Sequence, residues 1–292
     1  MVTTVIKGGL GNQLFQFASA YALSQRIGQS LSLDISFYSK QSLRSYKLDK
    51  LSLPDDVSIS PNNSLSILFF KNRLINRFIR RSRRFNLSKI KFNRDTTYLV
   101  ELAGRYVPLF FEINDKNIFM NGYYQSEDYF KEYRNTILKF YTPSYPLDDE
   151  FVSVLKDIQN CNSVAIHVRH GDFMKIKNSS FHYILDEHYY TKAISYIQHK
   201  TNNPSFFVFS DDIEWVKEHN LGIDNFKIIS LHTPNADIDE MMLMKSCNHI
   251  IAANSTFSWW AAWLNNHNNA IRITPNKPYG QDRLIPKTWI RI

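Results

Sequence analysis

SVAIHVRHGD, residues 163–172, is a short apolar run that leads directly into a cluster of polar side chains. Because the run is short and rich in valine and isoleucine, it predicts a buried strand of a parallel sheet. His167, Arg169, His170 and Asp172 then lie at the carboxyl end of that strand, where open α/β sheets bind ligands. A guanidinium at this place can bind a phosphate through two parallel hydrogen bonds. The alternative interpretation is a strand end with solvated polar side chains.

The rest of the second half alternates strands and helices without a break. Strands are predicted at residues 206–209, 227–230, 249–252 and 270–274, and helices at residues 187–199, 213–219, 237–247 and 257–264. This alternation is typical of a parallel sheet with helices on both faces.

The first half begins with the same pattern. A strand over residues 2–6, a glycine turn, a helix over residues 14–26 and a strand over residues 31–35 are predicted, and later a strand over 119–124 and a helix from Ser126. Residues 141–146 contain two prolines and are typical of a linker. We therefore predict an α/β protein of two similar Rossmann-like domains, residues 1–145 and 146–292, that face each other across a ligand-binding cleft.

Composition supports folded domains and narrows the function classes. The 292 residues are 43% hydrophobic and 14% aromatic, which argues against disorder and allows roughly two domains of ~150 residues. The two cysteines are too few for a disulfide framework and are predicted to be packing residues in a reducing compartment. The start of the sequence resembles no signal peptide, and no apolar run approaches the ~20 residues of a membrane span. We expect a soluble, cytoplasmic protein.

The net charge of +8 comes from one segment. Residues 71–94 contain ten lysines and arginines and no acid, and without them the chain has 25 basic and 27 acidic residues, a net charge of −2. Apolar residues at helical spacing, among them Leu74, Ile75 and Phe78, make the segment 64–94 a predicted basic amphipathic insertion. Such an element fits an anionic membrane surface, and the alternative is a solvated helix that covers the core. Nucleic acid is not expected, because the rest of the chain offers no basic groove.

Two more predicted strand ends are polar. Asn254, Ser255, Thr256 and Ser258 directly precede or open a helix, whose N–H groups and dipole favour a phosphate. Ser255 or Thr256 could equally be an N-cap, which is compatible with phosphate binding. Because parallel strands end at one edge of a sheet, these residues should converge with those that follow the strand at residues 164–168.

The third polar strand end is Ser210-Asp211-Asp212. We do not expect a metal here, because no third oxygen ligand follows in the sequence, and Asp212 could cap the next helix. Asp211 is then left to accept hydrogen bonds from a base, and the two adjacent donors of guanine suit a carboxylate. The chain has no zinc-type spacing, no Walker loop and no G-x-S-x-G, which weakens metalloenzyme, NTPase and hydrolase interpretations.

The glycine turn at residues 8–11, GGLG, lacks the spacing of a dinucleotide loop. Its glycines still allow a ligand to approach the helix start closely, and Asn12 offers an amide there.

Taken together, these motifs resemble bacterial α-1,2-fucosyltransferases of glycosyltransferase family 11. The matching segments are GGLGNQLFQ at residues 8–16, GYYQSE at 122–127, HVRHGD at 167–172, FSDD at 209–212 and NSTFSWW at 254–260. They follow in order along almost the whole chain. The resemblance implies a GT-B architecture, with an acceptor-side N-terminal domain and a C-terminal domain that binds GDP-β-L-fucose.

The resemblance also implies the roles of single residues. Arg169 would bind the diphosphate, and His167 and Asp211 the guanosine part. The phosphates would be held with the help of Asn254, Ser255, Thr256 and Ser258, and Asn12 would reach the donor from across the cleft. His170 stands where the family has a second arginine, so a fixed charge becomes pH-dependent. If this position contacts phosphate, donor affinity should fall as pH rises.

The implied reaction is inverting transfer of L-fucose to the 2-hydroxyl of a β-galactoside, in surface polysaccharide (O-antigen) synthesis. Arg169 and the helix start near Thr256 would stabilise the charge that develops on the β-phosphate, so no metal or other cofactor is expected. The general base is left open between Asp172 and Glu127. The acceptor would be a galactose-containing glycan, and the segment 64–94 would let the enzyme meet a lipid-linked acceptor at the inner membrane. The alternatives are an α-1,6- or α-1,3-fucosyltransferase, a glycan or sugar-nucleotide binding protein without turnover, and a nucleic-acid-binding protein.

Overall fold

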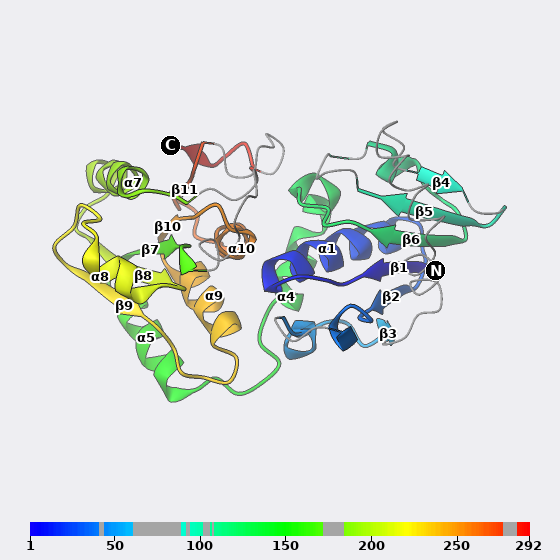
Figure 1. Ribbon diagram of the computed structural model, residues 1–292, viewed down its shortest axis with the longest axis horizontal. Coiled ribbons are helices and arrows are strands. Elements are labelled where there is room, and N and C mark those ends of the chain that lie inside the picture. The colour runs from blue at the N-terminus through cyan, green and yellow to red at the C-terminus, as the bar shows by residue number, and fades with distance from the viewer. Residues whose placement is uncertain are drawn as a thin grey trace. The chain divides into compact units, whose positions relative to one another are not determined.

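The computed structural model describes residues 1–40, 44–60, 89–91, 94–101, 106, 108–171, 184–276 and 285–292. The chain divides into two compact units, Met1–Ser144 and Tyr145–Ile292. Within the described residues each unit is built around a six-stranded sheet (Figure 1). The boundary between the units lies one residue before the predicted one.

The first sheet has the order β3-β2-β1-β6-β5-β4. Its strands are β1 (Val2–Val5), β2 (Leu31–Asp34), β3 (Ser58–Ser60), β4 (Lys89–Lys91), β5 (Thr96–Val100) and β6 (Asn117–Asn121). Neighbouring strands are parallel, as predicted, except that β4 runs antiparallel to β5 at the edge. An antiparallel edge strand is common on an otherwise parallel sheet.

One long helix and several short ones accompany this sheet. They are α1 (Leu10–Arg26), η1 (Tyr38–Lys40), η2 (Leu48–Lys50), η3 (Pro108–Glu112), η4 (Glu127–Tyr129), η5 (Lys131–Tyr133) and α4 (Arg134–Phe140). The helix expected from Ser126 is thus two 3-10 turns followed by α4. Ser126 caps the first turn, because its side chain accepts a hydrogen bond from the Asp128 N–H.

Helix α1 begins four residues earlier than predicted, inside the glycine turn. Gly9 is its N-cap, with an extended backbone, and its carbonyl accepts hydrogen bonds from the N–H groups of Asn12 and Gln13. The buried polar side chains of the helix are used to hold neighbouring loops. The Gln13 amide donates to the carbonyls of Gly8 and Ser45, and Gln16 Oε1 accepts from the Lys7 N–H at 2.9 Å. The start of α1 is therefore fixed to the loop after β1.

The second sheet has the order β12-β11-β10-β7-β8-β9, and every neighbouring pair is parallel. Its strands are β7 (Asn162–Val168), β8 (Pro204–Ser210), β9 (Phe226–Ile229), β10 (His249–Ile251), β11 (Arg272–Thr274) and β12 (Ile290–Arg291). The helices are α5 (Asp149–Gln159), α7 (Glu187–Lys200), α8 (Ile213–Glu218), α9 (Ala236–Ser246) and α10 (Thr256–Leu264). All of the strands predicted in this half are confirmed, and α5 and β12 are additions.

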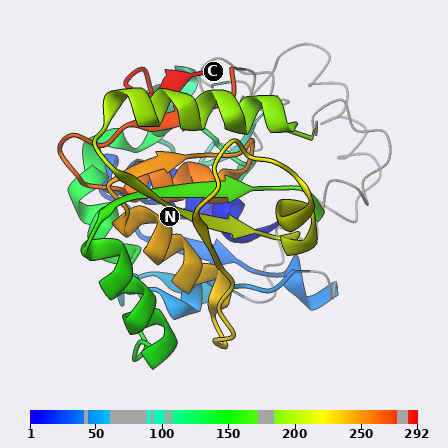
Figure 2. The same cartoon turned by 90° about the vertical axis from the view of Figure 1, so that its left-hand side faces the viewer.

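Helices cover both faces of this sheet, with α7 on one face and α5 and α9 on the other (Figure 2). Residues 163–168 of β7 are buried without alternation, as expected for a strand covered on both sides. The predicted inward face of α7 packs against the strands through Tyr190, Ala193, Ile194 and Ile197. Cys247 is buried and Cys161 half-buried, and neither forms a disulfide.

Most of the basic amphipathic insertion lies outside the described residues, namely residues 64–88 and 92–93. Its described end corrects the helical interpretation at residues 89–91, because these form strand β4. Lys89 and Lys91 form ion pairs with Asp115, with Nζ–Oδ distances of 3.6 and 3.2 Å. Within the described part of the chain, no helix is both long and apolar enough to span a bilayer.

Gly122, which follows β6, lies where any side chain would collide with its neighbours. A methyl group there would come 2.4 Å from Cβ of Glu101 and 3.0 Å from the ring of Tyr124. We expect Gly122→Ala to lower the free energy of unfolding by ~1–3 kcal/mol, because overpacking forces the backbone to shift. Urea denaturation measures this loss. Gly9→Ala is the matched control, because no described heavy atom lies within 4 Å of a methyl group there, and an equal loss in both variants would contradict the packing argument.

Candidate functional site

The three polar strand ends of the second unit converge, as predicted. In the register of the sheet, Ile166 of β7 pairs with Ile251 of β10 on one side and with Val208 of β8 on the other. The residues after these three strands therefore emerge side by side at the carboxyl edge. This edge brings together His167, Arg169, Asp211, Asn254, Ser255, Thr256 and Ser258.

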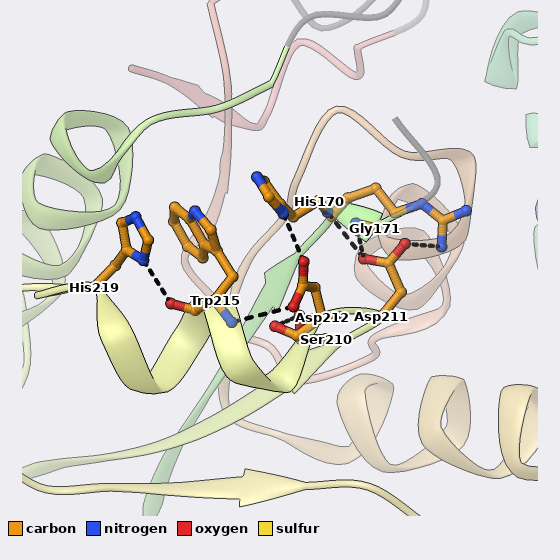
Figure 3. A network of polar contacts seen from close by, with 8 residues as sticks. His170, Gly171, Ser210, Asp211, Asp212, Trp215 and His219 are labelled. Atoms are coloured by element: carbon orange, nitrogen blue, oxygen red, sulfur yellow. Dashed lines mark hydrogen bonds and ion pairs between the residues drawn. The ribbon is translucent and has the colours of Figure 1, made fainter. Parts of the chain in front are cut away.

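Asp211 holds the loop that carries Arg169. Its Oδ1 accepts hydrogen bonds from the N–H groups of His170 at 2.9 Å and Gly171 at 3.2 Å (Figure 3). Its Oδ2 lies 3.2 Å from Nη1 of Arg169. The sequence left this carboxylate to accept bonds from a base, whereas the structure directs both oxygens to the neighbouring loop. Asp211 thus orients the guanidinium and fixes the backbone on either side of His170.

Gly171 is required by this close approach of two loops. A methyl group at this position would lie 2.9 Å from the backbone oxygen of Asp211. The two hydrogen bonds from backbone N–H groups to Asp211 Oδ1 therefore depend on a glycine at position 171.

The side chain of His170 contacts the segment after β8, which contains Asp211 and Asp212. Its Nδ1 lies 2.7 Å from Asp212 Oδ2, and its ring stacks on Trp215 with centroids 5.2 Å apart. Asp212 is also the N-cap of α8, as predicted, and accepts a hydrogen bond from the Trp215 N–H at 3.1 Å. The hydrogen bond with His170 holds the pKa of Asp212 below its ordinary value, and the bond from the Trp215 N–H makes the next largest contribution. His170 therefore braces α8, and Figure 3 shows its ring turned toward Asp212.

His167 is a buried, uncharged imidazole. Its residue is 3% exposed, and burial, aided by the positive charge of Arg169, lowers the pKa of His167 to about 3. Among the residues that the structure describes, its Nδ1 has no hydrogen-bond partner. Buried polar atoms are rarely left unpaired, so this nitrogen suggests a ligand atom as partner. The ring lies against Phe257, in the first turn of α10, with centroids 5.3 Å apart.

The burial of His167 predicts a pH dependence of stability. Its folded pKa of about 3 lies below the unfolded value of 6.5, so the unfolded chain binds the proton first and stability falls as pH falls below 6.5. When the pH falls from about 7 to about 5, the burial of this histidine should lower the free energy of unfolding by about 2 kcal/mol.

Urea denaturation at the two pH values tests the effect. His167→Gln should show a pH dependence weaker by that amount, whereas the same change at the exposed His188 should leave it as in the unmodified chain. A His167→Gln variant with the original pH dependence would refute the assignment.

The start of α10 has the features of an anion site. Ser255 is its N-cap, and its side chain accepts a hydrogen bond from the Phe257 N–H at 3.3 Å. The first turn contains no acid, so no carboxylate competes for the helix N-terminus. Ser258 is fully buried and donates to the carbonyls of Ala253 and Ser255, which makes it a support of the turn in this structure. Thr256, partly exposed, and the buried Asn254 flank the cap.

The remaining predicted residues lie elsewhere. Asn12 is in the first unit, in the first turn of α1, where its Oδ1 accepts a hydrogen bond from Gln125 Nε2 at 2.9 Å. Glu127, a candidate base, opens η4 and is partly exposed. Asp172, the other candidate, lies outside the described residues. Among the described residues no group of three or more His, Cys, Asp or Glu side chains is placed to hold a metal ion.

Sequence reasoning missed a second polar cluster, at the carboxyl edge of the first sheet. It contains Lys7, Glu101, Asn121 and Tyr123, which follow or end three neighbouring strands. An acid directly after the run YLV at residues 98–100 was the available signal, but β5 itself was not predicted.

Comparison with known proteins covers the whole chain. A family model described as Glycosyl transferase family 11 matches residues 1–290. Alpha-1,2-colitosyltransferase of Escherichia coli is 34% identical, with 100% of this chain and 99% of the relative covered. The O-antigen biosynthesis glycosyltransferase WbnK of Escherichia coli is 29% identical, with 98% and 99% covered. Galactoside 2-alpha-L-fucosyltransferase Sec1 of Mus musculus is 22% identical, with 96% and 69% covered.

Solved structures share the fold at lower identity. The α-1,6-fucosyltransferase NodZ, soaked with GDP-fucose, has a TM-score of 0.52 and 15% identity, with 90% of this chain and 91% of that chain covered. A mutant of FUT1 from Arabidopsis thaliana in complex with GDP has a TM-score of 0.53 and 13% identity, with 96% and 72% covered. The predicted α/β, GT-B class of fold is confirmed by this likeness.

Proposed function

The chain belongs to glycosyltransferase family 11, and we propose from this premise that it transfers L-fucose from GDP-β-L-fucose to the 2-hydroxyl of a β-galactoside. The observation that carries the proposal is the edge of the second sheet. There the guanidinium of Arg169 forms an ion pair with Asp211, and the buried Nδ1 of His167 has no partner among the described residues. Both side chains lie at the edge where α10 begins, and the first turn of α10 contains no acid. This combination suits a nucleoside diphosphate, which presents two anionic phosphates and a hydrogen-bonding base.

In the proposed reaction the acceptor oxygen forms a bond to C1 of fucose while the bond from C1 to the β-phosphate oxygen breaks. The electron pair of the broken bond stays on GDP, so negative charge develops on the β-phosphate. The guanidinium of Arg169 and the start of α10 would stabilise this charge, and Asn254, Ser255, Thr256 and Ser258 would shape the phosphate site. We propose that Arg169 and the dipole of α10 supply the positive charge that a metal ion supplies in other transferases.

His167 would contact the nucleotide through its unpaired nitrogen, and Asn12 would reach the donor from the N-terminal unit. For Asp211 the contacts favour positioning of Arg169 over direct contact with guanosine. The acceptor proton would go to a carboxylate, for which Asp172 and Glu127 are the candidates.

A second donor is favoured by one comparison. The relative with 34% identity is an α-1,2-colitosyltransferase, and colitose is L-fucose without its 3-hydroxyl. A site that forms hydrogen bonds to this hydroxyl would discriminate strongly against the deoxy sugar, because its polar groups would be left unpaired. GDP-colitose is therefore the donor to test against GDP-fucose.

The test is release of GDP from each donor with a panel of β-galactosides, followed by linkage analysis of the product. We expect rapid turnover with one donor and an α-1,2 linkage. An α-1,6 or α-1,3 product would assign another linkage, and tight donor binding without GDP release for every acceptor would favour a binding protein.

We also propose that the acceptor belongs to a surface polysaccharide such as O-antigen, in line with the name of WbnK, and that the enzyme works in the cytoplasm. The basic segment 64–94 would place it on the inner membrane beside a lipid-linked glycan. Flotation with anionic liposomes at low salt tests this part, and absence of binding would remove it.

A further inference from the structure

Three neighbouring strands of the first sheet end in polar residues at one edge. β1 leads to Lys7, β6 ends at Asn121, and β5 leads to Glu101. Lys7 Nζ donates to Asn121 Oδ1 at 2.7 Å, and Asn121 Nδ2 donates to the hydroxyl of Tyr98 at 2.7 Å. The edge is thus held together by a side chain from the loop after β1 and by side chains of β6 and β5.

Tyr123 presents an aromatic ring at this edge. The residue is 39% exposed, and Lys7 Nζ lies 5.1 Å from the centroid of its ring. A lysine over an aromatic face attracts it electrostatically, so Lys7, itself bonded to Asn121, helps to fix the ring. Close by, the hydroxyl of Tyr38 donates to the carbonyl of Gly8 at 2.8 Å, which ties η1 to the glycine turn.

Glu101 holds the segment that carries Tyr123. The acid is 7% exposed, and its Oε2 accepts a hydrogen bond from the Tyr123 N–H at 2.7 Å. Burial raises the pKa of Glu101, against the opposing effect of the N–H groups of Tyr124, Tyr123 and Gln125. Burying an acid is energetically unfavourable. Its use to hold this loop therefore suggests that the position of the loop matters.

The same segment contains a strained residue. Tyr124 has φ of +50°, a left-handed conformation that bulky residues rarely adopt, and its buried hydroxyl donates to the carbonyl of Leu99 at 2.9 Å. Strain of this kind persists where the surrounding structure enforces it, and it gathers at functional sites. The segment 122–125 is therefore held in one conformation by Glu101 on one side and Leu99 on the other.

Gln125 completes the edge. Its Nε2 donates to Asn12 Oδ1 at 2.9 Å, so the pair uses one donor and one acceptor on each other. This bond orients the Gln125 amide and leaves its Oε1 to accept a hydrogen bond from a hydroxyl group of a ligand.

We propose that this edge of the first unit, formed by Tyr123 and Gln125 and supported by Asn12, Glu101 and Lys7, binds a sugar of the acceptor glycan. The apolar C–H face of the sugar stacks on the ring of Tyr123, and the Gln125 amide binds one of its hydroxyls. Lys7 Nζ already donates to Asn121 Oδ1 and lies over the ring of Tyr123, which favours a neutral ligand over a phosphate. The identification of the sugar as the acceptor rests on the proposed function, whereas the site itself does not.

Binding without the donor tests the site directly. Saturation-transfer NMR of the full chain with millimolar methyl β-D-galactoside and lactose should show a bound sugar, and Tyr123→Ala should abolish the signal. Phe111→Ala is the matched control, because Phe111 is 40% exposed, has a cation 4.8 Å from its ring and lies in η3, before β6. Circular dichroism and urea denaturation should show all variants folded. No bound sugar on the unmodified chain, or equal binding by Tyr123→Ala, would overturn the site.

Kinetics separate this site from the donor site. Tyr123→Ala should raise the KM for the acceptor about tenfold, equivalent to ~1.4 kcal/mol. The KM for the donor and the slow hydrolysis of the donor without acceptor should stay unchanged. A rise in donor KM alone would overturn the assignment to the acceptor, and sugar binding without turnover would contradict the proposed function but not the site.

Discussion

Replacing Arg169 with alanine should lower the rate of GDP release by about a thousandfold, within the range measured for removal of a charged group that stabilises a transition state. The guanidinium stands at the carboxyl edge of the second sheet, with Nη1 3.2 Å from Asp211 Oδ2, so it is already oriented when the donor arrives. Its charge would act most strongly on the β-phosphate as the bond to fucose breaks, because the negative charge there increases at that point. We therefore expect the loss mainly in kcat, with a smaller change in donor affinity.

Steady-state GDP release with saturating donor measures this effect. Arg169→Lys should recover part of the rate, because it restores the charge but not the planar fork. The control is Lys217→Ala, which removes an exposed cation from the neighbouring helix α8 and should leave the rate unchanged. Near-normal turnover of Arg169→Ala would exclude the arginine from the reaction.

The second unit was predictable from sequence because its central strands, β7, β8 and β10, are largely buried. A run such as residues 163–168 is buried throughout and mostly apolar, and its shortness separates it from a helix. The first unit was harder, since β3 and β4 are three-residue strands with exposed or charged positions and β5 begins with two threonines. Pairing within the sheet, which is not encoded locally, makes these segments strands.

The same distinction applies to the candidate site. The convergence of residues after β7, β8 and β10 follows from parallel topology, so the sequence could predict it. The direction of each side chain depends on contacts between loops. Nothing local shows that the hydroxyl of Ser258 donates back to the carbonyl of Ala253, or that Glu101 reaches the N–H of Tyr123, which lies 22 residues further along the chain.

Asp211 gives the strongest test of this difference. Asp211→Asn retains one oxygen for the N–H groups of His170 and Gly171 but places an amide where Oδ2 now faces Arg169. The guanidinium keeps its charge and loses its orienting partner. We expect kcat/KM for the donor to fall by roughly 10–100-fold, less than in Arg169→Ala, because an unpaired group of this kind costs ~1–3 kcal/mol.

A double-mutant cycle with Arg169→Lys separates positioning from base recognition. If Asp211 acts through Arg169, the two losses should overlap, and the double variant should be far less impaired than their product predicts. Glu214→Gln, at an exposed position of α8, is the control and should leave kcat/KM unchanged. Additive losses, together with weaker discrimination between GDP and ADP as inhibitors, would show instead that Asp211 contacts guanine. In that case the ion pair with Arg169 would have to open when the donor binds.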